Sequence, residues 1–122
     1  MGANDAKVNV VEEKTKAFAL RIVRLYQYLR EKKKEYVLSK QVVKSGTSIG
    51  ANVKEAIRAQ SKPDFYAKLY IALKEASETE YWLELLERSE LVSSESLSHL
   101  IHDCGSIRRM LVTSVNTAKS NT

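Results

Sequence analysis

Apolar residues recur every three or four positions from Val8 to Leu29, and this period constrains the fold more than any other feature. The seam, which includes one threonine, is Val8, Val11, Thr15, Phe18, Ile22, Leu25 and Leu29. Steps of three and four place all of these side chains on one side of an α-helix, as in the a/d seam of a coiled coil. A helix of this kind must bury its seam against other helices.

A second helix is predicted after the charged stretch EKKKEY. Ser39 is a good N-cap residue, because its side-chain oxygen can accept a bond from a free backbone N–H of the first turn. Leu38 precedes it and can pack on Val43 as a hydrophobic staple. We therefore expect this helix to begin at Ser39.

Serine also marks the start of two further helices. Ser61 stands three residues before Asp64, which allows a capping box, and Pro63 fits a first helical turn. Ser93 or Ser94 can cap the last helix. The four predicted helices cover about residues 8–33, 39–60, 62–90 and 94–117.

The predicted fold class is all-α. No segment alternates with the two-residue period of a strand, and four Gly and one Pro leave little to break helices. Short connections make successive helices antiparallel, so we predict one up-down-up-down four-helix bundle over residues 1–122. Its expected core contains Phe18, Ile22, Leu25, Ile49, Leu69, Leu83 and Leu111.

The segment SGTSIGAN has the composition of a ligand-binding loop but not the context of one. A P-loop requires a strand before it and a Lys after its second Gly, and a nucleophile elbow requires a strand-to-helix turn. We therefore place Gly46 and Gly50 inside a helix, where each costs about 1 kcal/mol relative to Ala. Small residues four apart let a second helix approach closely, and Asn52 on this face then needs a hydrogen-bond partner. The alternative is that Thr47, Ser48 and Asn52 bind a ligand.

The third predicted helix carries two apolar stripes, although a bundle core requires only one. One stripe is Phe65, Leu69, Ala72, Ala76, Leu83 and Leu86. The other includes Tyr66, Tyr70 and Tyr81, with Trp82 beside it. Because Tyr and Trp anchor protein interfaces, we expect these four residues at a subunit contact. The alternative is a wider core from which the tyrosine hydroxyls reach water.

The positive charge is concentrated in the first half of the chain. The net charge is +5; residues 1–60 hold 13 Lys and Arg against 6 Asp and Glu, whereas residues 61–122 hold 7 against 9. Such asymmetry points to a nucleic acid or to a partner surface of opposite sign. Basic faces bind phosphates without reading bases. The candidate contacts are Arg21, Arg24, Lys40, Lys44, Lys54 and Arg58. The alternative is a set of solvated helix faces.

Other chemistry is weak or absent in the sequence. His99 and His102 could share a helix face, but a metal site would need two more ligands, so we expect surface histidines and no metal or cofactor. The acidic residues are not paired as acid and base, and we expect no enzymatic activity and no small-molecule substrate. Cys104 is the only cysteine and reads as a core residue.

The expected compartment is the cytoplasm. A single cysteine excludes an intrachain disulfide and favours a reducing environment. The N-terminal segment MGANDAKVNV lacks an apolar signal core, and no apolar run approaches the roughly 20 residues of a membrane helix. We therefore expect no membrane partner.

Two segments, VVKSGTSIGANVKEA and DFYAKLYIALKEASETEYWLELL, resemble the bacterial four-helix-bundle family encoded in intervening sequences of 23S rRNA genes and often labelled ribosomal-protein-like. The likeness spans roughly residues 8–115. The S-x-x-S-I-x-A-N-x-x-E-A pattern of the family matches at Ser45, Ser48, Ile49, Ala51, Asn52, Glu55 and Ala56. A signature in the third helix matches at Ala72, Leu73, Glu75, Ala76, Glu78, Tyr81 and Leu83.

The resemblance implies bundles that assemble as homopentamers, and it implies no catalysis. The accessory protein of diversity-generating retroelements, which works with a reverse transcriptase and nucleic acid, is a more distant likeness. We therefore expect a non-enzymatic ring, most simply a pentamer, that binds RNA or DNA non-specifically through its basic faces. The alternative is a purely structural or protein-binding ring without nucleic acid.

Overall fold

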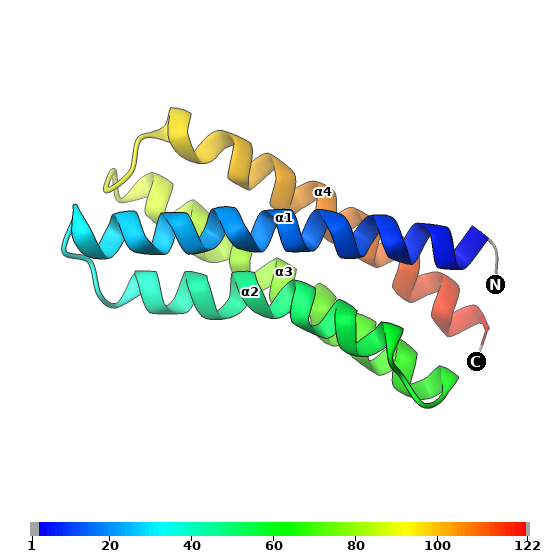
Figure 1. The fold of residues 1–122 in the computed structure, drawn as a ribbon. Helices are drawn as coiled ribbons and strands as arrows, with labels where there is room; N and C mark the ends of the chain where they lie inside the picture. Colours follow the sequence, from blue (N-terminus) through cyan, green and yellow to red (C-terminus); the bar gives the residue numbers. More distant parts are fainter. Residues whose placement is uncertain (1–2, 122) are drawn as a thin grey trace.

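Four antiparallel helices form the molecule, which a computed structural model describes over residues 3–121, with side chains from residue 9 onward (Figure 1). Their bounds are α1 (Ala3–Glu31), α2 (Leu38–Ile57), α3 (Lys62–Arg88) and α4 (Ser94–Ser120). Short connections make each helix run opposite to the one before it. The predicted all-α, up-down-up-down four-helix bundle is confirmed. Val8, the first residue of the predicted seam, lies outside the described side chains.

The helix ends differ from the predicted ones by a few residues. α1 begins five residues earlier, at Ala3, and ends at Glu31; α2 and α3 end earlier, at Ile57 and Arg88, and α4 continues to Ser120. Lys34, with φ 55°, turns the chain out of α1 in the left-handed conformation common after helix C-termini.

Ser39 does not cap α2, which corrects the prediction. The helix begins one residue earlier, and the carboxylate of Glu35 accepts hydrogen bonds from the N–H groups of Val37 (3.2 Å), Leu38 (3.0 Å) and Ser39 (2.7 Å). A carboxylate at this position satisfies free amides and interacts favourably with the helix dipole. The Ser39 side chain is instead buried, and its Oγ has no hydrogen-bond partner among the described residues.

The serine caps of α3 and α4 lie where the sequence predicts them. The Ser61 Oγ accepts a bond from the N–H of Asp64 (3.2 Å), and the Ser93 Oγ accepts one from the N–H of Ser96 (3.2 Å). The reciprocal half of the capping box is displaced by one residue, because the Asp64 carboxylate accepts a bond from the N–H of Gln60 (3.3 Å). Both helices therefore start from side-chain caps.

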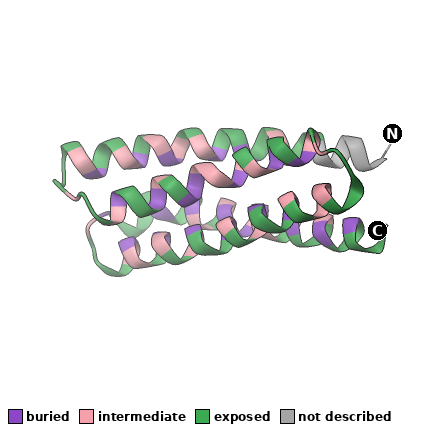
Figure 2. Ribbon diagram, turned by 90° about the horizontal axis from the view of Figure 1, so that it is seen from below, coloured by how far each residue is buried: buried purple, intermediate pink, exposed green. Residues whose placement is uncertain are grey.

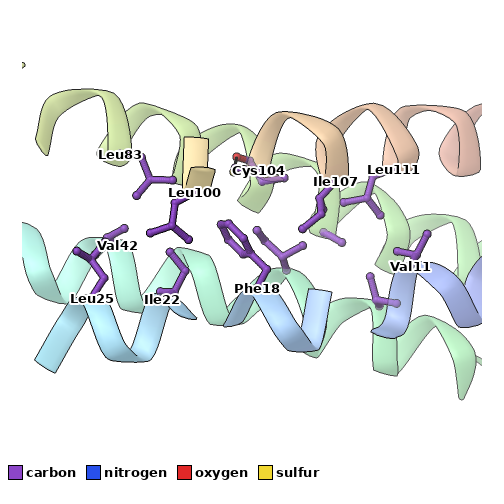
Figure 3. Close-up of a cluster of buried hydrophobic side chains, with 14 of the residues drawn as sticks. Val11, Phe18, Ile22, Leu25, Val42, Leu83, Leu100, Cys104, Ile107 and Leu111 are labelled. Atoms are coloured by element: carbon purple, nitrogen blue, oxygen red, sulfur yellow. Dashed lines mark hydrogen bonds between the residues drawn. The ribbon is translucent and has the colours of Figure 1, made fainter. Parts of the chain in front are cut away.

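The core follows the axis of the bundle, and buried residues lie on the inward sides of all four helices (Figure 2). The predicted core residues Phe18, Ile22, Leu25, Ile49, Leu69, Leu83 and Leu111 are all buried. Figure 3 shows side chains of α1 and α4, among them Phe18 and Ile107, converging in the middle of this core. The a/d seam of α1 is therefore used as its period predicts.

A buried pair of hydroxyl groups links α2 to α3. Ser45 and Thr79 are fully buried and hydrogen-bonded, with 2.9 Å between their oxygens. Thr79 also lies 2.7 Å from the carbonyl oxygen of Glu75. Because Thr79 has one hydroxyl proton and gives it to the carbonyl, Ser45 supplies the proton of the bond between the two side chains. Ser45, a residue of the family pattern, thus joins two helices.

Candidate nucleic-acid and subunit interfaces

The contact of α2 with α1 depends on two glycines. A Cβ atom on Gly46 would lie 2.8 Å from Cγ2 of Ile22, and one on Gly50 would lie 3.2 Å from Oγ1 of Thr15. Ile22 and Thr15 are completely buried, so neither side chain has free space into which to move. The glycines therefore let α1 come closer than any side chain would allow.

The polar residues around these glycines bond to their own helix. The hydroxyls of Thr47 and Ser48 donate to the carbonyl oxygens of Val43 and Lys44, at 2.6 Å each. The Asn52 amide is half-buried and donates to the carbonyl oxygen of Ser48 (2.9 Å). Asn52 therefore has its partner within α2 and does not reach another helix. A hollow of about 280 Å³ lies on this seam, lined by Thr15 of α1 and Gly50 of α2 among others.

The six basic residues proposed from the sequence fall on two separate surfaces. Four of them, Lys40, Lys44, Lys54 and Arg58, are exposed on the outer side of α2. The other two, Arg21 and Arg24, lie on the edge of α1 that faces α4. The structure therefore separates a basic face on α2 from a basic edge on α1.

The basic face of α2 keeps most of its charge available to solvent. Lys54 forms an ion pair with Glu12 of α1 (3.1 Å), whereas Lys40 and Arg58 form none among the described residues. Lys44 lies close enough to Glu75 to lower the pKa of that carboxyl. Partial burial and the neighbouring Glu78 outweigh this effect, and the pKa of Glu75 is raised above 4.5.

The seam between α1 and α4 is the smallest of the four helix contacts in the bundle. In Figure 1 the start of α4 (yellow) stands apart from α1. A hollow of about 730 Å³, which we name the seam groove, opens there between the two helices and the connections at that end. Its lining is Arg21, Arg24, Leu25, Tyr28, Lys33, Glu90, Leu91, Val92, Ser93, Ser96, Leu97 and Leu100.

Two smaller hollows continue along the same seam. One, of about 180 Å³, is lined in part by Lys14, Arg21 and Ser106, and another, of about 250 Å³, lies between Val10 and Met110. The Arg21 guanidinium is paired with the Asp103 carboxylate across the seam, at the border between the seam groove and the first of these hollows. The side of α1 that faces α4 is therefore open along much of its length.

The seam groove combines free cations with an apolar floor. Arg24 and Lys33 form no ion pair or hydrogen bond among the described residues, and Glu90 is the one acidic residue in the lining. Tyr28 is 41% exposed, whereas Leu97 and Leu100 lie beneath the surface. Such a groove suits a ligand with both negative charge and apolar area.

Sequence reasoning placed Arg21 and Arg24 on a basic face but missed the seam groove. Its other walls come from Lys33, in the connection after α1, and from residues 90–93, in the connection before α4. Lys33 belongs to the segment EKKKEY, which the sequence indicates only as a charged connection. No pattern in the sequence shows that these two connections lie beside each other.

The four aromatic residues proposed for a subunit contact differ in exposure. Tyr70 and Tyr81 are 46% and 56% exposed, whereas Tyr66 and Trp82 are half-buried and pack against the core. The rings form two pairs: Tyr66 stacks on Tyr70, with centroids 6.1 Å apart, and Tyr81 meets the edge of Trp82 at 5.0 Å. Ile71 of α3 and Val112 of α4 are also exposed. Exposed apolar side chains therefore remain on the outer sides of α3 and α4.

Between α3 and α4, polar side chains and the buried cysteine make defined contacts. Arg108 donates from Nε to Glu80 (2.6 Å), and the Cys104 thiol donates to the carbonyl oxygen of Ala76 (3.4 Å). Burial, followed by the negative charge of Glu80, raises the pKa of Cys104 to about 12. The Cys104 thiol is therefore a buried, protonated group of the core.

The described residues contain neither a cluster that could hold a metal ion nor a helix that could span a membrane. His99 and His102 are both exposed, and no group of three or more metal-ligating side chains exists within the described part of the chain. Over residues 3–121, no helix combines the length and the apolar character needed to cross a bilayer.

Comparisons with known proteins agree with this architecture. A family model described as 23S rRNA-intervening sequence protein matches residues 7–113. The chain is also similar to the crystal structure of a Bacteroides thetaiotaomicron protein of unknown function from the S23 ribosomal protein family. The TM-score is 0.88 and the identity 52%, over 90% of this chain and 98% of that chain. Among curated proteins, none gives a significant match.

Proposed function

We propose that this chain, which belongs to the 23S rRNA-intervening sequence protein family, is a non-enzymatic cytoplasmic scaffold that forms a ring and binds the phosphate backbone of nucleic acid. The observation that carries the proposal is the exposure of the basic face of α2. Lys40, Lys44, Lys54 and Arg58 are exposed, and Lys40 and Arg58 lack ion pairs among the described residues. Free cations on one rigid helix bind polyanions by releasing condensed counterions.

Base reading is not part of the proposal. The exposed side of α2 presents lysines and one arginine but no cluster of Arg, Asn and Gln of the kind that recognises base edges. Binding is therefore expected to be nearly independent of sequence and strongly dependent on salt.

Ring assembly rests on two further features of the surface. Four exposed residues leave apolar area uncovered on the outer sides of α3 and α4, namely Tyr70, Ile71, Tyr81 and Val112. Residues 1–60 also hold 13 of the 20 Lys and Arg, whereas residues 61–122 hold more acidic than basic side chains. A ring joins different faces of neighbouring subunits, so an acidic face can meet a basic one. The family resemblance favours five subunits.

The absence of enzymatic activity is part of the same proposal. Glu75 and Cys104 have raised pKa values, which is common in active sites. The Glu75 carboxyl lies near the charged groups of Lys44, Lys74 and Glu78, and Cys104 is enclosed in the core. Neither residue lines any of the hollows described above.

Two measurements test the proposed function. Light scattering at micromolar concentration should give a multiple of the 13.8 kDa chain mass, and a monomer mass would contradict the ring. Titration of labelled RNA and DNA should show binding at low salt that weakens steeply as salt rises. Replacing Lys40, Lys44, Lys54 and Arg58 by Gln should weaken binding to all sequences alike and flatten the salt dependence. A parent protein that binds neither polymer at low salt would support the alternative, a ring that binds only proteins.

A further inference from the structure

We propose that the seam groove between α1 and α4 binds a single nucleic-acid strand in preference to a duplex. This inference rests on the proposed function and adds a second surface to it. The groove has a volume of about 730 Å³ and opens at the end of the bundle where α1 ends and α4 begins. The basic face of α2 plays no part in its lining.

The cations of the seam follow one edge of α1. Lys14, Arg21 and Arg24 all line hollows of the α1–α4 seam. They span about 15 Å of helix at roughly 1.5 Å per residue. Lys33 extends the series into the connection after α1. A linear series of cations along a hollow matches the way a strand backbone is followed in single-strand binding proteins.

Of these cations, two are available for phosphates within the seam groove. Arg21 is committed to Asp103, whereas Arg24 and Lys33 have no partner among the described residues. Glu90 belongs to the same lining, and its negative charge would repel an anionic ligand. The seam groove therefore carries an excess of positive charge that one substitution, Glu90→Gln, would increase.

The expected preference for a single strand comes from Tyr28 and from the apolar floor of the seam groove. Tyr28 is 41% exposed within the groove lining, and Leu25, Leu97 and Leu100 are buried residues of the same lining. An unpaired base can stack on an aromatic ring or lie on apolar surface, whereas bases in a duplex are already stacked on one another. Helix α2 itself contains no aromatic residue. Its basic face is expected to treat both forms alike.

The experiment compares two variants of equal charge loss by fluorescence anisotropy. The groove variant is Arg24→Gln with Lys33→Gln, and the matched control is Lys40→Gln with Arg58→Gln on α2. The probes are labelled single-stranded DNA of about 12 nucleotides, within the usual site size, and a duplex of the same length. The groove variant should weaken single-strand binding about tenfold and duplex binding less than about threefold. The control should weaken both forms to a similar extent.

Two single substitutions separate stacking from charge. Tyr28→Leu keeps the apolar bulk and should weaken single-strand binding roughly five- to tenfold, with the salt dependence unchanged, because stacking releases no counterions. Glu90→Gln should tighten single-strand binding by about two- to threefold through loss of one repulsive charge. A gain in affinity cannot result from a misfolded variant, and thermal unfolding checks the others.

Several outcomes would overturn the seam groove as a single-strand site. They are equal affinity of the parent for both probes, an equal loss in the groove variant and the control, and an unchanged affinity of Tyr28→Leu. Each of these leaves nucleic-acid binding on α2 intact. If the parent binds neither probe at low salt, the proposed function itself fails, and the inference fails with it.

Discussion

The two sides of α1 show opposite forms of helix packing. Toward α2, Gly46 and Gly50 bring the two backbones together around Ile22 and Thr15, which are completely buried. Toward α4, the contact is the smallest in the bundle, and three hollows follow the seam, against one hollow of about 280 Å³ on the side of α2. One helix therefore has a closed side and an open side.

The difference follows from the size and polarity of the residues that face each neighbour. Glycine removes the side chain, so a helix can approach until backbone and core atoms touch. The opposite edge of α1 carries Lys14, Arg21, Arg24 and Tyr28, whose polar ends must stay in water. A helix cannot close on such an edge. The closed side therefore holds the fold, and the open side is the one at which we propose a ligand.

The largest expected effect is at the closed seam. Gly46→Val places a branched side chain where even a Cβ would be 2.8 Å from Ile22. Ile22 is fully buried, so the variant should lose roughly 3 kcal/mol of unfolding free energy through overpacking. Urea unfolding measures the change.

A control at the open seam makes the first prediction specific. Ala17 is exposed and lines the smaller hollow beside Arg21, so Ala17→Val places the same final side chain in open space. Its unfolding free energy should change by less than about 1 kcal/mol, mostly through helix propensity. Equal losses in the two variants would contradict the contrast between the sides of α1.

Serine substitutions at the starts of α2 and α3 should have effects of opposite sign. The buried Oγ of Ser39 has no partner among the described residues, so Ser39→Ala should stabilise the protein by about 1 kcal/mol. Ser61 caps α3, so Ser61→Ala should destabilise it by about 1 kcal/mol. Thermal unfolding of the pair gives the signs. A loss at Ser39 would show that its hydroxyl has a partner after all.

The ion pair across the open seam should contribute little to stability. The side chains of Arg21 and Asp103 are 39% and 44% exposed, so water and salt screen their attraction. A double-mutant cycle with Arg21→Gln and Asp103→Asn should give a coupling of about 0.5 kcal/mol that shrinks in high salt. A coupling of several kcal/mol would mean that this pair closes the seam.

The smallest effect concerns Glu75, on the far side of α2. Its folded-state pKa is raised above the ordinary 4.5, mainly by partial burial, so the folded protein holds this proton more tightly than the unfolded chain. Stability is therefore lost as pH rises from about 4.5 through the folded pKa. Glu75→Gln should melt slightly higher than the parent at pH 7 and equally at pH 4. A difference that is independent of pH would exclude this cause.

The fold was predictable because the relevant signals are local. Steps of three and four fix which side of each helix is buried, and the core residues follow from those steps, as Ile22 and Leu111 show. The capping serines of α3 and α4 also act within one turn. By contrast, the cap of α2 comes from Glu35, which accepts from three backbone amides and follows Lys34 in a left-handed conformation. No rule of spacing marks Lys34 for that conformation.

The candidate site was less predictable because it depends on how helices and connections lie in space. Helical spacing put Arg21 and Arg24 on one face, but it could not show that this face borders α4 while Lys40 and Arg58 point outward from α2. The seam groove also joins Lys33 to the distant connection before α4. Such a juxtaposition follows from the inclination of two helices, which the sequence pattern does not fix.

Hydrogen exchange of backbone amides, measured with and without single-stranded DNA, tests most directly whether the open side of α1 is the ligand side. Without DNA, residues 94–103 at the open seam should exchange faster than residues 42–53 at the closed seam, because fewer contacts hold them. With DNA, exchange should slow over residues 21–33 and 90–103 in addition to any slowing over residues 40–58, which carry the basic face of α2. Slowing confined to residues 40–58 would contradict the account.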